Sequence, residues 1–175
     1  YKNPEATARI LSPDGWLNTG DLGVWTHDGH FAIRGRAKDT IVLLGGENIE
    51  PVPIESRLRE SEYIEQAVVV GQDQKFLGAL VQVDLKAVEL YLKANGIPYI
   101  ARTSLSAMPE VKELINEEIT LRINARTGFR PFERIGRFAI LEKPFETGVE
   151  LSAKQEVKRH VINDMYAKEI DSLFR

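Results

Sequence analysis

Strand-length apolar runs and helical segments follow each other without strict alternation, and this order constrains the fold more than any other feature of the sequence. Helical spacing of apolar residues marks 51–63, 88–95, 109–127 and part of 154–174. Strand-like apolar runs occupy 64–70, 79–83 and 135–141. Because strands and helices are mixed without a regular βαβ repeat, the sequence predicts an α+β domain.

The first 36 residues are rich in turn formers and short apolar runs, which predicts β-structure throughout this stretch. Residues 22–25 and 30–33 flank the turn signal Asp28-Gly29 and predict a β-hairpin. A second glycine turn, Gly45-Gly46, ends the apolar run 40–44, and the stretch 97–107 predicts a loop.

Composition excludes several classes of function. The formal net charge is -3, whereas binding to a nucleic-acid backbone requires a concentrated basic face. The sequence has no cysteine, which excludes disulfides and thiolate metal sites and fits a reducing compartment. The histidines, His27, His30 and His160, have no neighbouring metal-ligand pattern, so we expect no metal held by this chain. No apolar run approaches the roughly 18 residues of a membrane helix.

The segment Gly15–Asp21 (GWLNTGD) places a carboxylate directly after a glycine turn. A carboxylate in such a place suits a ribose diol, because its two oxygens can accept both hydroxyl protons. The alternative from the residues alone is that Asp21 caps a turn.

Three segments in fixed order carry a resemblance to a known family: Tyr1–Thr7 (YKNPEAT), Gly15–Asp21 and Gly35–Ile49 (GRAKDTIVLLGGENI). Together they resemble the adenylate-forming superfamily, which includes acyl- and aryl-CoA ligases, firefly luciferase and the adenylation domains of peptide synthetases. The later stretch Phe132–Leu141 (FERIGRFAIL) is similar to long-chain fatty acyl-CoA ligases in particular.

The resemblance implies two parts. Residues 1–37 would be the end of a large N-terminal adenylation domain that is otherwise missing from this sequence. Residues 38–175 would be the small C-terminal lid, with a short mixed sheet and flanking helices. Because the phosphate-binding loop and the fatty-acid pocket belong to the missing domain, we expect this fragment alone to be inactive.

The resemblance also assigns roles to residues near this boundary. Asp21 would hold the ribose hydroxyls of ATP, with Thr19 of the same motif, and Arg36 would contact the nucleotide. Lys38 matches the hinge about which the lid rotates between an adenylating and a thioester-forming pose. The loop Gly45–Glu47 would face the active site in the second pose, although an ordinary hairpin turn is its alternative. Glu55 falls on an acidic family position, where a structural role is equally open.

The family's catalytic lysine lies on a loop near the C-terminus, where its ammonium stabilises charge in adenylation. A gapless alignment anchored on Glu150-Leu151 and Lys158-Arg159 places Glu156 at that position, and a glutamate would repel phosphates. Lys154 lies two residues earlier and is the predicted catalytic lysine. Lys158 is the second candidate, and loss of efficient adenylation is the third alternative.

The implied reaction is ATP-dependent adenylation of a medium- or long-chain fatty acid, with Mg²⁺ on the triphosphate, followed by transfer to coenzyme A. One alternative is a degenerate, non-catalytic module that binds nucleotide or protein. Another is an enzyme that loads a carrier protein instead of CoA. We expect a cytoplasmic location, and the fatty substrates leave peripheral membrane contact open, although no amphipathic basic anchor is evident.

Overall fold

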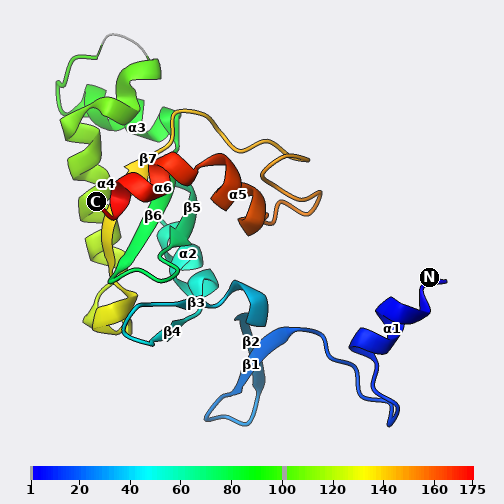
Figure 1. Cartoon of the computed structure of the whole chain (residues 1–175). Helices are drawn as coiled ribbons and strands as arrows, with labels where there is room; N and C mark the ends of the chain where they lie inside the picture. The colour runs from blue at the N-terminus through cyan, green and yellow to red at the C-terminus, as the bar shows by residue number, and fades with distance from the viewer. Residues whose placement is uncertain (1, 100–101) are drawn as a thin grey trace.

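A three-stranded mixed sheet forms the centre of the fold in the computed structural model (Figure 1), which describes residues 2–99 and 102–175, the side chains of 102–104 excepted. Its strands are β5 (Ile64–Val70), β6 (Leu77–Val83) and β7 (Ile135–Ile140), in that spatial order. β5 and β6 pair antiparallel, and β6 and β7 pair parallel. Every residue of the central strand β6 is buried, which explains its largely apolar sequence; the exception, Gln82, donates to the carbonyl of Lys143 at 2.9 Å.

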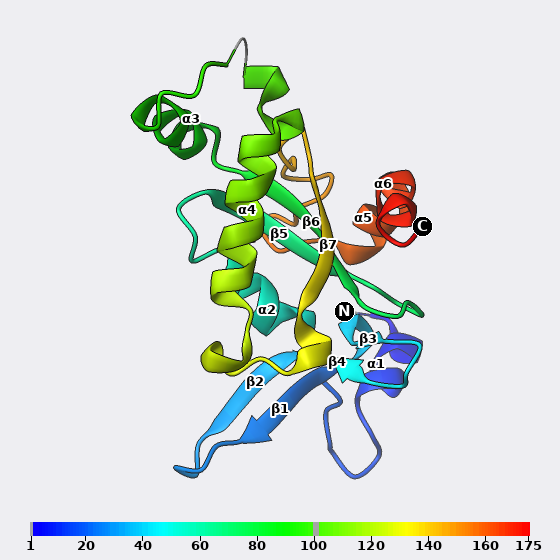
Figure 2. The ribbon, with the colours of Figure 1, turned by 90° about the vertical axis from the view of Figure 1, so that its left-hand side faces the viewer.

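Helices cover both faces of this sheet (Figure 2). Alternate residues of the strands point to opposite faces, so Val69 and Val81 join one core cluster while Val68 and Leu80 join the other. On the first face lie α2 (Pro51–Leu58), α3 (Leu85–Ala94) and α4 (Pro109–Arg122). On the second lie α5 (Arg159–Met165) and α6 (Ala167–Leu173). The predicted α+β class with a short mixed sheet and flanking helices is therefore confirmed.

The N-terminal residues extend away from this body (Figure 1). The predicted hairpin is confirmed as β1 (Asp21–Trp25) paired antiparallel with β2 (Phe31–Arg36). The β-structure predicted for the first 36 residues does not extend to Pro4–Ile10, which form the helix α1. Proline stands at the start of this helix and the Asn3 side chain accepts from the backbone N–H of Ala6, so local capping outweighs the turn formers.

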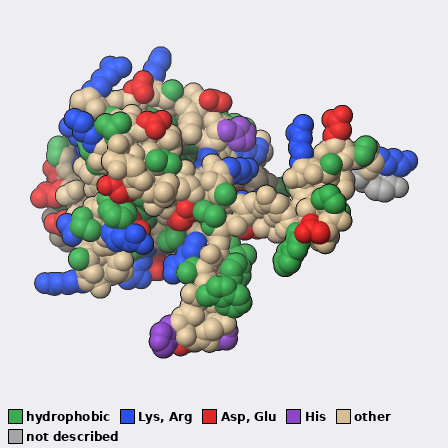
Figure 3. Space-filling view, turned by 60° about the horizontal axis from the view of Figure 1, so that its bottom comes forward, with side chains coloured by type: hydrophobic (Ala, Val, Ile, Leu, Met, Phe, Trp, Pro, Cys, Tyr) green, Lys and Arg blue, Asp and Glu red, His purple; other side chains and the backbone are tan. Residues whose placement is uncertain are grey.

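The projecting hairpin carries large apolar side chains in contact with solvent. The side chains of Trp25 and Ile33 are 73% and 68% exposed, and Trp16 in the preceding loop is 77% exposed. Figure 3 shows hydrophobic side chains gathered on this arm. Apolar surface on this scale is typical of a face that packs against another body of protein.

Several boundaries differ from the sequence predictions. Between the hairpin and the sheet, β3 (Ile41–Val42) and β4 (Asn48–Ile49) enclose the Gly45-Gly46 loop, after the 3₁₀ turn η1 (Ala37–Asp39). The predicted helices 51–63 and 109–127 end at Leu58 and Arg122; after the second, the Asn124 side chain caps the separate turn η3 (Ala125–Thr127).

The segment 97–107, predicted as a loop, contains the 3₁₀ turn η2 (Arg102–Ala107), and its residues 100–101 lie outside the described part. A further 3₁₀ turn, η4 (Pro131–Glu133), precedes β7. Across the described ranges, none of the helices combines the length and the apolar character needed to cross a bilayer.

Candidate active-site cleft

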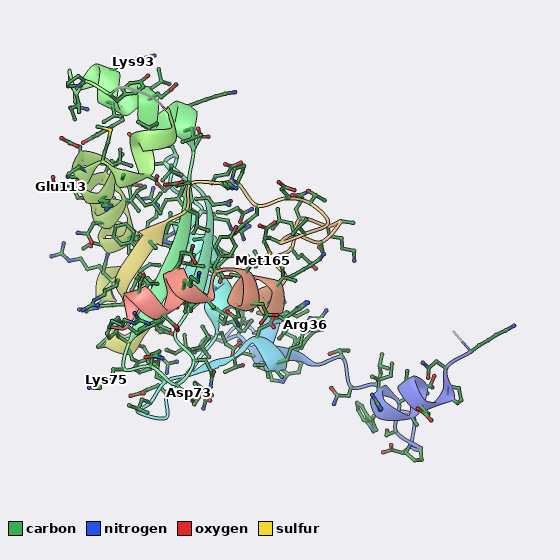
Figure 4. The ribbon with its side chains drawn as sticks, turned by 45° about the horizontal axis from the view of Figure 1, so that its top comes forward. Arg36, Asp73, Lys75, Lys93, Glu113 and Met165 are labelled. Carbon is green, nitrogen blue, oxygen red and sulfur yellow. The ribbon has the colours of Figure 1, made fainter. Side chains whose placement is uncertain are left out.

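A cleft of about 1400 Å³ lies where the segment after the hairpin meets the C-terminal helices. Its walls come from the segment Arg36–Ile41, from α2 and β5, and from parts of the stretch Ser152–Arg175. Lysine and arginine side chains outnumber carboxylates along these walls, which favours a negatively charged ligand. Figure 4 labels Arg36 at the end of β2, on the side of the molecule where α5 lies.

Asp21 and Arg36, both predicted to bind the nucleotide, contact each other. They are opposite residues in the β1–β2 register, and Nε of Arg36 lies 3.0 Å from Oδ1 of Asp21. Arg36 lines the cleft, whereas Thr19 does not and its hydroxyl instead accepts from the backbone N–H of Asp21 at 3.2 Å. The pairing leaves Asp21 with free oxygen lone pairs, because one guanidinium contact cannot satisfy a carboxylate.

Lys38, the predicted hinge residue, lies in the 3₁₀ turn η1 between the projecting hairpin and β3. Its side chain is exposed and lines the same cleft as Arg36. The backbone N–H of the preceding Ala37 donates to the carbonyl of Gly20 at 2.9 Å, which ties the turn to the base of the hairpin. Residue 38 thus occupies the connection between two bodies, where a hinge would have to be, and its role stays a prediction.

Lys154 lies at the tip of a small hairpin that enters the same cleft. Leu151 and Val157 form the bridge at its base, and the backbone N–H of Ser152 donates to the carbonyl of Glu156 at 2.8 Å. Gln155 closes the turn in the left-handed region with φ 63°. The structure therefore brings the predicted lysine to the cleft that Arg36 and Lys38 line.

The two candidate lysines differ in their contacts. The ammonium of Lys158 donates to the carbonyl of Gly148 at 2.7 Å, so it is engaged within its own loop. The ammonium of Lys154 is exposed and contacts no acceptor in the part of the chain that the structure describes. Glu156 is also exposed and lines the cleft, two residues away. These contacts favour Lys154 as the lysine available to a ligand.

The loop Gly45–Glu47 lies outside the cleft walls. It is an exposed turn closed by a bond of 3.0 Å from the N–H of Leu43 to the carbonyl of Glu47, with Gly46 at φ 88°. The N–H of Leu44 donates to the carbonyl of Gln74 at 2.8 Å, which holds the loop beside the β5–β6 turn. This conformation therefore does not bring Lys154 and the glycine loop to one place, and the role of the loop in CoA transfer stays a prediction.

The buried carboxylate of Glu150 anchors the start of the Lys154 hairpin. It accepts from the backbone N–H of Glu146 at 3.0 Å and from the hydroxyl of Tyr166 at 3.0 Å. Burial opposes ionisation of Glu150, but hydrogen bonds from the backbone of Glu146 and Glu150 and from Tyr166 outweigh it and lower the pKa. Burial, followed by the bond to Glu150, raises the pKa of Tyr166 to about 12.

We expect Glu150→Ala to lower the free energy of unfolding by about 1–3 kcal/mol at neutral pH, because the N–H of Glu146 and the hydroxyl of Tyr166 lose a buried, charged acceptor. The pKa of Glu150 is lower in the folded chain than its ordinary value of 4.5. Its contribution is therefore present above the unfolded pKa and is lost as pH falls through the folded pKa. Urea unfolding at successive pH values should show a smaller loss on acidification in Glu150→Ala than in the unmodified chain. Glu156→Ala, an exposed carboxylate of the same hairpin, should behave like the unmodified chain, and equal acid sensitivity of all three would contradict the assignment.

Residues 38–175 match the family described as AMP-binding enzyme C-terminal domain. The chain belongs to the AMP-binding enzyme family. The predicted resemblance to adenylate-forming enzymes is thereby confirmed. The division into 1–37 and 38–175 as parts of two domains stays a prediction.

Curated relatives of this chain include fatty acid ligases. The chain is 36% identical over 176 residues to the long-chain-fatty-acid–CoA ligase FadD15 of Mycobacterium tuberculosis, covering 99% of this chain and 29% of that protein. It is 32% identical over 187 residues to the chloroplastic long-chain-fatty-acid–[acyl-carrier-protein] ligase AEE15 of Arabidopsis thaliana, covering 99% and 23%. The chain thus spans about a quarter of the length of these relatives.

The fold is shared with a solved structure of the superfamily. The adenylation domain of a carboxylate reductase from Mycobacterium chelonae superposes with a TM-score of 0.81 at 23% identity, covering 99% of this chain and 25% of that chain. At this identity the likeness establishes the fold alone. It confirms the expected architecture of the C-terminal part of an AMP-binding enzyme.

Sequence analysis missed one residue of the cleft. Arg159 donates through Nη2 to both carboxylate oxygens of Glu55, at 2.7 and 2.6 Å. In the sequence, Arg159 stood out only as part of the basic pair Lys158-Arg159, one of the two anchors of the gapless alignment. The two partners are 104 positions apart, so no local pattern could have joined them.

In the described residues of the AMP-binding enzyme, no group of three or more His, Cys, Asp or Glu side chains is placed to hold a metal ion. His27 and His30 are exposed on the projecting hairpin, and His160 is exposed at the cleft. Asp21 is paired with Arg36.

Proposed function

We propose that this chain is the C-terminal part of an AMP-forming fatty acid–CoA ligase, in which it closes over ATP during acid adenylation. The observation that carries the proposal is the shared cleft of Arg36, Lys38 and Lys154, with Asp21 held against Arg36. Two regions far apart in sequence contribute these groups: the β1–β2 hairpin with the turn that follows it, and the loop that carries Lys154. Their charges suit a nucleotide ribose and its phosphates, and the curated ligase relatives support a fatty acid as the substrate.

The described residues fit ATP but do not fit a metal. Asp21 would accept the ribose hydroxyl protons, and Arg36 would hold the nucleotide beside it with a permanent charge and several donors. The residues that the structure describes offer no carboxylate cluster for Mg²⁺, so we assign none of them to that ion. In the intact protein, Mg²⁺ would neutralise charge on the triphosphate.

In adenylation, the fatty acid carboxylate attacks the α-phosphorus of ATP and pyrophosphate leaves. Lys154 would place its ammonium between the acid carboxylate and that phosphate, where negative charge accumulates in the transition state. Its ammonium has no partner among the residues that the structure describes, so no bond to these residues has to break before it binds.

Thioester formation would use a second pose of the same lid. Rotation about Lys38 would withdraw Lys154 and bring in the Gly45-Gly46 loop, whose exposed backbone allows close approach of a pantetheine chain. The loop lies outside the cleft of Lys154 in this conformation, which is what alternation between two poses requires.

Fatty-acid-dependent exchange of pyrophosphate into ATP by the intact protein tests the first step. We expect exchange with medium- or long-chain acids, acyl-CoA formation when CoA is added, and neither activity from residues 1–175 alone. No exchange across a panel of acids would contradict the proposal and favour a degenerate binding module in which Glu156 replaces the lysine.

The acyl acceptor is tested separately, because one relative is an acyl-carrier-protein ligase. The intact protein is given a fatty acid and ATP, with either free CoA or a phosphopantetheinylated carrier protein. Consumption of free CoA supports the proposed ligase. Turnover with the carrier protein but not with free CoA would show that the acyl acceptor is the carrier protein.

A further inference from the structure

Arg159 is the most connected charged residue of the cleft. Beyond its two bonds to Glu55, Nη1 donates to the carbonyl of Val69 at 3.3 Å and Nε lies 3.9 Å from Oδ2 of Asp39. Glu55 is buried and its Oε1 also accepts from the backbone N–H of Val69 at 2.8 Å. A buried two-oxygen pairing of this kind is strong only when its geometry and remaining hydrogen bonds are satisfied, as they are here.

These contacts join four parts of the lid at one guanidinium. Glu55 belongs to α2, Val69 to the edge strand β5, and Asp39 to the turn η1, directly after Lys38. Arg159 itself is the first residue of α5. The start of α5 is therefore fixed to the sheet and to α2, and it also faces the segment next to the predicted hinge.

The hairpin that carries Lys154 ends immediately before this point. Its base is closed by the Leu151–Val157 bridge and by a bond of 2.8 Å from the N–H of Lys158 to the carbonyl of Glu150. One residue later, Arg159 makes the contacts that hold the returning strand of the hairpin to the body of the lid. At the exposed tip, the side chain of Gln155 donates to the hydroxyl of Thr147 at 2.9 Å, which is a contact within the same loop and not to the body of the lid.

We propose that Arg159 is a positioning residue for adenylation: through Glu55 and Val69 it fixes the base of the Lys154 hairpin and so aims the Lys154 ammonium into the cleft. The expected effect on catalysis rests on the proposed function. The attachment of the hairpin by Arg159 does not, because it depends only on contacts within residues 38–175. Misplacement of a catalytic group by about 1 Å costs on the order of 100-fold in rate, so a loosened base is expected to affect catalysis.

The test uses Arg159→Gln in the intact protein, with Arg57→Gln as the matched control. Arg57 also pairs with a glutamate through a contact of 2.6 Å, to Glu60, but it does not line the cleft. Because Arg159→Gln leaves Glu55 buried without its partner, the double variant Arg159→Gln/Glu55→Gln is measured beside it to remove the uncompensated charge. Arg159→Lys keeps the charge without the several donors with which the guanidinium reaches both Glu55 and Val69.

Catalysis is measured as two half-reactions, pyrophosphate exchange and thioester formation from supplied acyl-adenylate. We expect Arg159→Gln and the double variant to lose about tenfold or more in exchange kcat, while thioester formation changes less than about twofold. Arg159→Lys should recover part of the loss. A parallel fall of both half-reactions, following the thermal stability, would show a merely structural role and overturn the proposal.

Amide hydrogen exchange tests the positioning without any activity. We expect faster exchange at the N–H groups of Ser152 and Lys158 in Arg159→Gln and in the double variant than in Arg57→Gln. Unchanged protection of both amides would overturn the proposal. An intact protein without pyrophosphate exchange but with this loss of protection would contradict the proposed function and leave the anchoring role of Arg159 supported.

Discussion

Replacing Lys154 by alanine in the intact protein is expected to lower fatty-acid-dependent pyrophosphate exchange by about 100- to 1000-fold, the usual effect of removing one preorganised charge-stabilising group. The ammonium lies at the tip of the hairpin, at the cleft and without a partner in the described part of the chain. Removing it should therefore change transition-state stabilisation without disturbing the fold. The loss should appear mainly in kcat, because the ammonium acts where charge develops.

Lys158→Ala is the matched comparison, since it removes a lysine from the same loop. Its ammonium is bound to the carbonyl of Gly148, so we expect exchange to stay within a few-fold of the unmodified protein. Collapse in Lys158→Ala with full activity in Lys154→Ala would transfer the catalytic role to Lys158. Full activity in both variants would contradict a catalytic role for either lysine.

Replacing Asp21 by alanine is expected to lower kcat/KM for ATP by about 10- to 100-fold, because a hydrogen bond to a charged group contributes about 1.5–3 kcal/mol. The change removes the proposed ribose acceptor and also frees Arg36, whose Nε is 3.0 Å from the carboxylate. The effect should fall mostly on KM for ATP, with KM for the fatty acid nearly unchanged.

Asp28→Ala is its control, because Asp28 is an exposed carboxylate at the far end of the same hairpin. We expect it to leave both KM values unchanged. If Asp21→Ala also left KM for ATP unchanged, Asp21 would be only a turn-capping residue, the alternative that its sequence context allows.

Periodicity predicted the central elements because burial determines them. β5 and β6 are largely apolar since both faces of the sheet are covered, and the stripe along α4 follows from one buried side. α1 escaped prediction because a short exposed helix depends on a single cap at Asn3. The end of α4 was predicted too late for a similar reason: Asn124 caps a new turn, although the apolar spacing continues past it.

The site could be predicted only where its residues share one motif or neighbouring motifs. Asp21 and Arg36 meet because the hairpin register places them opposite each other. The pairing of Arg159 with Glu55 depends on how α5 returns to β5 and α2, and spacing along the chain carries no information about that. The sequence likewise could not show which of the two lysines is available to a ligand, because the contact of Lys158 with Gly148 is visible only in the structure.

The most direct test of the central claim is a crystal structure of the intact protein with a fatty acid and a non-hydrolysable ATP analogue. The account predicts the Lys154 ammonium at about 3 Å from an oxygen of the α-phosphate or the acid carboxylate. It also predicts Asp21 on the ribose hydroxyls and Lys158 still bound to Gly148. A structure with Lys158 or no lysine at the phosphate, and Lys154 in solvent, would contradict it.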